Sequence, residues 1–154
     1  MKNMIYLIMM VCQLISCEKN DGGPSEIKLL GYGTSFGMRV GYCTNSMLLR
    51  SGTVTYSRSG WNNQVTPIKC TENMTQISWE SFKKIVDLNE FFSLPEVIGC
   101  PDCADGGAEW VEIENFSGKK YRVTFEYGNA PEELEDVVSA LREQSEKGIP
   151  CGEF

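Results

Sequence analysis

The fold is decided by one stretch of the chain, EWVEIENFSGKKYRVTFEY, residues 109–127. Apolar and polar residues alternate in its two halves, and the SGKK between them is a turn sequence, so the stretch predicts a β-hairpin. Side chains along a strand point to opposite faces in turn, so Val111 and Ile113 share a face that Trp110 does not. We expect Val111 and Ile113 to face helices and Trp110 to lie on the solvated side.

Further strands and two helices are predicted around this hairpin. The expected strands comprise residues 26–33, 46–50, 53–56 and 65–71. Apolar residues at helical spacing run from Ser78 to just before Pro95, and a second apolar stripe follows Pro131. This order predicts an α+β fold, namely a mainly antiparallel sheet of about five to six strands with two helices packed on one face.

The composition limits the domain count and the chemistry. The chain has 154 residues, a formal net charge of -7 and no histidine. Without imidazole it has no Ser-His-Asp or Cys-His pair and no histidine-ligated metal. An acidic chain also lacks the basic surface that releases counterions from phosphates, so we expect no nucleic-acid partner. The length suits a single domain, which we place at residues 26–154.

The first residues resemble the signal of a bacterial lipoprotein. Lys2 precedes an apolar stretch, residues 4–11, which is too short to span a bilayer. The stretch leads into LISC, residues 14–17, which resembles a lipobox. The resemblance implies a signal peptide of residues 1–16 and a lipid on Cys17. The alternative is an ordinary secretory signal in which Cys17 has no special role.

A tether and a membrane location follow from the lipoprotein interpretation. Residues 17–25 are polar and rich in glycine and proline, which is typical of a flexible linker. Glu18 follows Cys17 where inner-membrane retention commonly uses Asp, so by resemblance to lipoprotein sorting we expect the outer membrane. The side of that membrane stays open. Each buried methylene of an acyl chain contributes roughly 0.8 kcal/mol, so several chains would anchor the protein permanently.

Five cysteines remain in the expected domain. They are Cys43, Cys70, Cys100, Cys103 and Cys151. Cysteines outside the cytoplasm tend to form disulfides, so all are disulfide candidates, and their odd number leaves at least one unpaired. The CPDC motif, residues 100–103, allows a structural disulfide, which we favour, a redox pair or a zinc site. A redox thiolate needs a helix N-terminus, whereas a strand follows here, and zinc needs four ligands.

A second group of candidates lies within and just after the CPDC motif. Asp102, Asp105 and Glu109 stand around two glycines, and such carboxylates suit calcium binding or acid–base chemistry on a sugar. Their spacing does not match an EF-hand, and Asp beside Gly is common in ordinary turns. With Trp110, a residue type enriched at hot spots, they form our candidate ligand-binding set. The alternative for Trp110 is packing against the preceding loop. We assign no catalytic residue, metal or cofactor.

Two longer motifs carry a family resemblance. They are SFGMRVGYC, residues 35–43, and LPEVIGCPDCADGGAEWVE, residues 94–112. They resemble an uncharacterised family of small bacterial lipoproteins, many of them in Bacteroidetes, and the resemblance covers roughly residues 27–142. It implies a secreted α+β domain with paired cysteines and no established activity. In related sequences a cysteine often stands where this chain has Arg39, which leaves open which cysteine here lacks a partner.

Two classes of function stay open. The first is a lipid-anchored binding or inhibitory module of the cell envelope, which is favoured by the small domain and the missing nucleophile–base pair. The second is an envelope enzyme that uses the CPDC cysteines in thiol redox chemistry or the nearby carboxylates in acid–base chemistry. We expect the first class, with the membrane and an envelope protein as partners.

Overall fold

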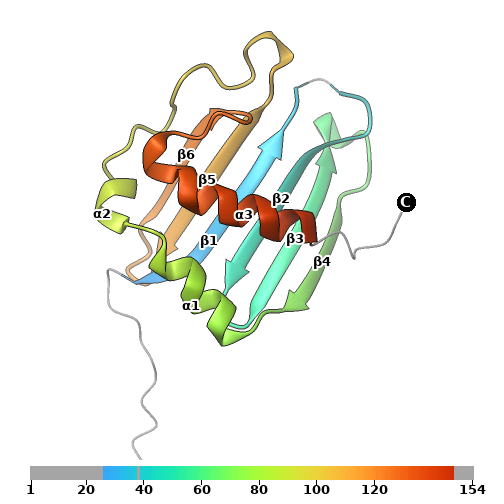
Figure 1. Ribbon diagram of the computed structural model, residues 1–154. Coiled ribbons are helices and arrows are strands. Elements are labelled where there is room, and N and C mark those ends of the chain that lie inside the picture. Colours follow the sequence, from blue (N-terminus) through green and yellow to red (C-terminus); the bar gives the residue numbers. More distant parts are fainter. Residues whose placement is uncertain (1–25, 38, 148–154) are drawn as a thin grey trace, which may run out of the picture.

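A computed structural model describes residues 26–37 and 39–147 (Figure 1). These residues form two layers, a β-sheet and the helices that cross one of its faces. The expected signal peptide, the lipidation site Cys17, the tether up to residue 25 and Cys151 lie outside the described residues.

The described strands form a single antiparallel sheet. They are β1 Ile27–Ser35, β2 Tyr42–Arg50, β3 Thr53–Gly60, β4 Ile68–Asn73, β5 Ala108–Asn115 and β6 Lys120–Glu126. Their order is β4-β3-β2-β1-β5-β6, and each neighbouring pair is antiparallel. The predicted α+β fold is confirmed. Strands β2 and β3 are longer than expected because their pairing continues through polar residues such as Thr44 and Ser59.

The helices follow β4 and β6. They are α1 Gln76–Lys84, α2 Leu88–Phe91 and α3 Glu135–Lys147, and a 3-10 turn, η3 Glu132–Leu134, leads into α3. Figure 1 shows α1 and α3 on the same face of the sheet, as predicted. The prediction of one helix from Ser78 to Pro95 is wrong, because the segment begins earlier and is interrupted after α1.

Two capping residues explain these helix boundaries. The Thr75 side chain accepts a hydrogen bond from the Ser78 N–H at 3.2 Å, so the helix begins one turn before Ser78. Asp87 accepts hydrogen bonds from the N–H groups of Asn89 and Glu90 at 2.8 and 3.1 Å. A residue that caps a new helix has extended backbone, so Asp87 separates α1 from α2.

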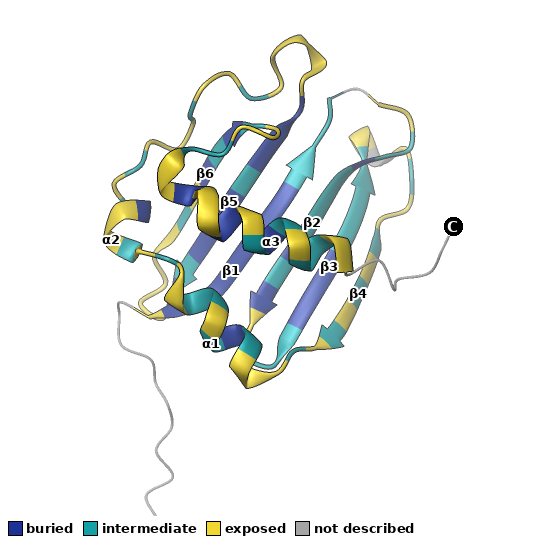
Figure 2. Ribbon diagram, in the orientation of Figure 1, coloured by how far each residue is buried: buried dark blue, intermediate teal, exposed yellow. Residues whose placement is uncertain are grey.

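The core lies between the sheet and the helices (Figure 2). Its buried side chains include Leu30, Tyr32, Met47, Leu49, Val54, Val111, Ile113, Val123 and Phe125 from the strands and Trp79, Phe91, Val137, Val138 and Leu141 from the helices. Val111 and Ile113 are fully buried, which confirms that they face the helices. We call this side of the sheet the helix face and the other side the open face. Trp110 lies on the open face, as the alternation predicts.

The two ends of the sheet carry different connections. At one end, near the top of Figure 1, β1, β3 and β6 finish and β2, β4 and β5 begin. We call this the loop end; its connections comprise residues 36–37, 39–41, 61–67, 99–107 and 127–129. Ile27, where the sheet begins, lies at the opposite end.

Candidate functional site

The four residues of the predicted ligand-binding set lie in three places. Asp102 and Asp105 lie in the loop before β5, at the loop end. Glu109 lies on the helix face, where it contacts α3, and Trp110 lies on the open face. Successive residues of a strand point to opposite faces, so Glu109 and Trp110 do not line a common site. The structure therefore does not bring the set together.

Glu109 belongs to a buried hydrogen-bond cluster between sheet and helix. Its side chain is 0% exposed. Arg142 of α3 donates from Nε to Oε1 at 2.7 Å and from Nη2 to Oε2. The Tyr32 hydroxyl donates to Oε1, and the Gly128 N–H donates to Oε2 at 3.1 Å. Both carboxylate oxygens are thus satisfied within the protein.

The electrostatics of this cluster favour an ionised Glu109. Burial raises the pKa of the Glu109 carboxyl, but hydrogen bonds from Arg142, Tyr32 and Gly128 outweigh burial, and the pKa is lowered. Burial raises the pKa of the Tyr32 hydroxyl, and its hydrogen bond to Glu109 raises that pKa further. Glu109 is therefore half of a structural ion pair, with no free oxygen for a metal or for proton transfer.

Trp110 is packed against the sheet rather than projecting from it. It pairs directly with Gly33, and a Cβ atom on Gly33 would lie 2.2 Å from the indole ring. The Arg122 guanidinium lies 5.2 Å from the ring centroid and also donates to Glu112 at 2.6 Å. These contacts leave Trp110 half-buried. The sequence signal for this packing is the glycine opposite the ring, which becomes visible only once the strand register is known.

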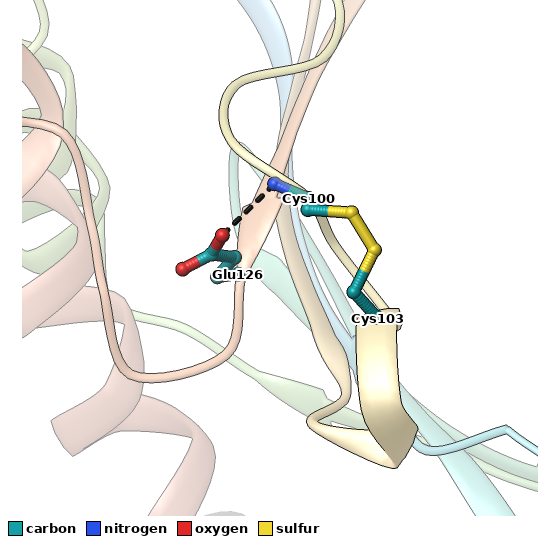
Figure 3. The surroundings of a disulfide bond; sticks show 3 residues. All are labelled: Cys100, Cys103 and Glu126. Carbon is teal, nitrogen blue, oxygen red and sulfur yellow. Dashed lines mark hydrogen bonds between the residues drawn. A yellow bond between two sulfur atoms is a disulfide. The ribbon is translucent and has the colours of Figure 1, made fainter.

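The CPDC motif forms a disulfide loop at the loop end (Figure 3). Cys100 and Cys103 are bonded to each other, and their Cα atoms are 5.5 Å apart. This confirms the expected disulfide in the segment. Glu126 Oε1 accepts a hydrogen bond from the Cys100 N–H at 2.9 Å, and Asp102 Oδ1 accepts one from the Gly37 N–H at 3.3 Å. These bonds hold the loop against β6 and against the residues that follow β1.

The other described cysteines differ in their pairing. Cys70 takes part in a disulfide. Cys43 is a free thiol and is buried at the start of β2. The odd number of cysteines in the expected domain thus leaves Cys43 unpaired among the described residues.

Strained backbone gathers at the loop end. Four described residues other than glycine have left-handed φ values: Asn62 at 48°, Asp102 at 64°, Ala104 at 53° and Asp105 at 58°. All four lie in loop-end connections. Asn and Asp adopt this conformation more readily than other residues with side chains, so the strain is clearest at Ala104; such strain persists where the surroundings enforce it, often at binding or catalytic sites. The sequence analysis selected Asp102 and Asp105 because of their carboxylates, not because of their backbone, and it missed Asn62 and Ala104.

Two arginines at the loop end lie on aromatic rings. The Arg39 guanidinium is 4.6 Å from the ring centroid of Phe36, whose ring packs edge-on against Tyr127 with centroids 4.7 Å apart. The Arg58 guanidinium is 5.1 Å from the ring centroid of Tyr42. We call these pairs the two arginine stacks. Sequence reasoning missed both; the Arg58 stack is not visible in the sequence because Arg58 and Tyr42 come from different strands.

A row of polar side chains crosses the helix face next to the Arg58 stack. The strand register places Glu109, Thr34, Asn45 and Arg58 opposite one another, and directly paired residues share a face. Arg58 Nε donates to Asn45 Oδ1 at 3.1 Å, so the guanidinium leans toward the middle of the row. Thr34, Asn45 and Arg58 are half-buried, and Figure 2 shows this part of β1, β2 and β3 beside α3 as partly exposed.

The loop end suits recognition better than metal or redox chemistry. Within residues 26–37 and 39–147, no three His, Cys, Asp or Glu side chains are grouped so that they could hold a metal ion. The Cys100 N–H is bound by the Glu126 carboxylate, whereas a reactive thiolate needs a cation or a helix N-terminus beside it. The only helical segment next to these cysteines is a three-residue 3-10 turn, η2 Cys103–Asp105, and not an α-helix.

A separate cavity of about 360 Å³ lies between the α1–α2 junction and the start of α3. It is lined by Ile85, Asp87, Glu90, Glu132, Glu133 and Asp136. Most of these carboxylates lie in the first turns of α2, η3 and α3, where negative charge stabilises a helix through its dipole. The position of these carboxylates therefore has a structural explanation, and the loop end is the stronger candidate for the functional site.

The comparisons with known proteins add no assignment. A scan against protein-family models and a search of curated proteins find no match for this chain. No helix in the described part of the chain is both long enough and apolar enough to cross a membrane.

Proposed function

We propose that this protein is a lipid-anchored binding or inhibitory module of the bacterial cell envelope, and that its loop end binds the partner without catalysis. One observation carries the proposal: the non-glycine residues with left-handed backbone, among them the strained Ala104, and the two arginine stacks lie at one end of the sheet. Loops that a rigid sheet holds in strained conformations are typical of binding sites.

Exposed apolar side chains at the same end support a binding role. Val40 is 96% exposed, Trp61 47% and Tyr127 49%. Aromatic residues are enriched at protein interfaces, where they bury much area at little cost in conformational freedom. The loop end therefore combines apolar, aromatic and cationic groups, which a partner surface can cover together.

The place where the tether would enter the sheet also supports the proposal. Ile27 lies at the end of the sheet opposite the loop end, and β1 has 9 residues. At roughly 3.3 Å per residue, β1 separates the two ends by about 30 Å. A tether of residues 17–25 that is anchored at Cys17 would lead into the Ile27 end. The loop end would then point away from the membrane, which we infer to be the outer membrane.

We also infer membership of the uncharacterised lipoprotein family that the two long motifs resemble. The free thiol of Cys43 supports this inference. It lies in the same motif as Arg39, where related sequences often have a cysteine. A chain that has lost a cysteine at position 39 is expected to keep one thiol unpaired, and Cys43 is such a thiol.

The alternative is a thiol redox enzyme, and the Cys100–Cys103 disulfide is the observation that favours it. The acidic neighbour Glu126 and the lack of a following α-helix count against it. The two functions differ in a simple assay: a redox enzyme would reduce or oxidise a disulfide-bonded substrate catalytically, and a binding module would not.

Lipid labelling tests the anchor. We expect the full chain, produced in a Gram-negative bacterium, to incorporate labelled palmitate and to stay in the outer-membrane fraction after a high-salt wash. The Cys17→Ser variant should lose both properties. A Cys17→Ser protein that stays in the washed membrane would contradict the anchor.

Capture from envelope extracts tests the binding role. The detergent-solubilised full chain serves as bait beside two variants, Trp61→Ser at the loop end and Phe116→Ser at the opposite end; both side chains are close to half exposed. We expect a specific component that the wild type and Phe116→Ser retain and Trp61→Ser loses. Equal capture by all three baits would contradict binding at the loop end.

A further inference from the structure

The arginines of the two stacks have no carboxylate partner in the described part of the chain. Among the described residues, Arg122 and Arg142 form ion pairs with Glu112 and Glu109, whereas Arg39, Arg58 and the distant Arg50 form none. The chain as a whole has a net charge of -7, so carboxylates outnumber cations. Arginines that remain unpaired in such a chain keep their donors available to a ligand.

The two stacks lie on neighbouring strand ends. The Phe36 N–H donates to the Cys43 carbonyl at 2.9 Å, so Phe36 and Tyr42 come from adjoining ends of β1 and β2. Arg58 comes from β3, the next strand, and reaches Tyr42 and the β2 side of the sheet. The rings that hold the two guanidinium groups therefore belong to neighbouring strand ends, and neighbouring strands lie roughly 4.8 Å apart.

Two carboxylates in this part of the molecule, Glu109 and Asp102, already have donors. Glu109, at the end of the polar row, is bound by Arg142, Tyr32 and Gly128. Asp102 accepts a hydrogen bond from the Gly37 N–H. The side chains between Glu109 and Arg58 in the row, Thr34 and Asn45, are neutral. The positive charge of the two stacks is therefore not cancelled by a direct ion pair.

Stacking prepares these guanidinium groups to bind oxyanions. An arginine that lies on an aromatic ring loses little freedom when it binds, and its planar fork matches a carboxylate or phosphate with two parallel hydrogen bonds. We propose that Arg39 and Arg58 bind a ligand that carries at least two carboxylate or phosphate groups, with Thr34 and Asn45 as neutral hydrogen-bonding neighbours. This rests on the proposed function, because it names the chemistry of the partner bound at the loop end.

Titration calorimetry on the detergent-solubilised full chain at low salt tests the proposal. The probes are tripolyphosphate, a free oxyanion; polygalacturonate, a polymer with pendant carboxylates; the galacturonate trimer; and dextran, a neutral polymer. We expect binding of at least one anionic probe and none of dextran. Tighter binding of polygalacturonate than of its trimer would identify a polymer as the source of the anions, and tripolyphosphate binding alone would identify a free oxyanion. Dextran binding as tight as that of the anionic probes, or no binding of either anionic probe, would overturn the proposal.

Matched variants locate the site. Arg39→Gln and Arg58→Gln should each weaken binding of the anionic probe by about tenfold or more, the effect of losing a charged hydrogen bond. Arg58→Lys keeps the charge without the planar fork, so it should bind more weakly than the wild type but more tightly than Arg58→Gln. Arg50→Gln is the control, since Arg50 is an exposed arginine at the other end of β2. Equal weakening by Arg50→Gln, or wild-type binding by both loop-end glutamine variants, would contradict the assignment.

The oxyanion site and the proposed binding function can be contradicted independently of each other. If the Arg39→Gln, Arg58→Gln double variant still captures the envelope component at wild-type yield, the binding function stands and the oxyanion site is wrong. If tripolyphosphate binds through these arginines but no envelope component depends on Trp61, the oxyanion site stands and the proposed binding function fails.

Discussion

Arg142 on α3 pairs with the fully buried carboxylate of Glu109 on β5, although 33 residues separate them in the sequence. The pair joins the helix layer to the sheet at one end of the polar row. Glu109 is directly opposite Thr34, which in turn pairs with Asn45, so the ion pair and Arg58 lie at opposite ends of the same row.

Loss of Arg142 should destabilise the fold strongly. In Arg142→Met the Glu109 carboxylate stays buried without its charged donor, and breaking such a pair costs roughly 3 kcal/mol of unfolding free energy. Urea unfolding measures the change. Lys147→Met is the control, because Lys147 pairs with the exposed Glu143 on the same helix, and it should unfold like the wild type. A wild-type urea midpoint for Arg142→Met would contradict the structural role of the pair.

Acid should remove the contribution of Glu109. The pKa of Glu109 is lowered in the folded protein, so its stabilising effect is present above the unfolded-state pKa of about 4.3 and is lost as the pH falls through the lowered pKa. As the pH falls below about 4.3, the unfolding free energy of the wild type should therefore fall more steeply than that of Glu109→Gln. Parallel pH profiles for the two proteins would show that folding does not lower the pKa of Glu109.

Trp110 and Gly33 should be energetically coupled. Trp110→Ala should lower the unfolding free energy by about 2 kcal/mol, because the ring is packed. Gly33→Ala should also destabilise, since the new Cβ would meet the ring at 2.2 Å, but less so in the Trp110→Ala background. Gly31→Ala is the control, because its Cβ would meet Leu48 and Glu112 rather than Trp110. Additive effects of Gly33→Ala and Trp110→Ala would contradict the contact.

Peptide mapping of the unreduced protein should show a defined cysteine pattern. We expect Cys100 linked to Cys103, and Cys43 alkylated only after denaturation because its thiol is buried. Cys70 is disulfide-bonded, and Cys151 is the remaining cysteine of the expected mature domain, so we expect these two in one linked peptide. Alkylation of Cys100 in native protein, or Cys43 in a disulfide, would contradict this pattern.

Local patterns were sufficient to predict the sheet and the last helix. The alternation in residues 109–127 depends only on neighbouring residues, and it correctly placed Val111 and Ile113 against the helices. The stripe after Pro131 likewise includes Val137, Val138 and Leu141, which are buried. The break at Asp87 was missed because the apolar spacing continues across it, while the capping hydrogen bonds that interrupt the helix involve polar side chains.

The candidate site was less predictable because its contacts are not local. Alternation already places Glu109 on the face of Val111, but its partner Arg142 is distant in the sequence. The stack of Arg58 on Tyr42 depends on the pairing of β2 with β3, and the packing of Trp110 depends on the glycine opposite it in β1. The first contact requires the packing of α3 on the sheet, and the other two require the strand register, which a single sequence does not specify beyond the hairpins.

Site-specific photo-crosslinking in the cell envelope tests the central claim, that the loop end is the binding surface. A photoreactive amino acid replaces Val40 at the loop end, which is 96% exposed, or Phe116 at the opposite end, which is 48% exposed. Both variants keep Cys17 and are illuminated in intact cells. We predict a defined adduct from position 40 and none from position 116. Equal adducts from both positions, or an adduct from position 116 alone, would contradict the claim.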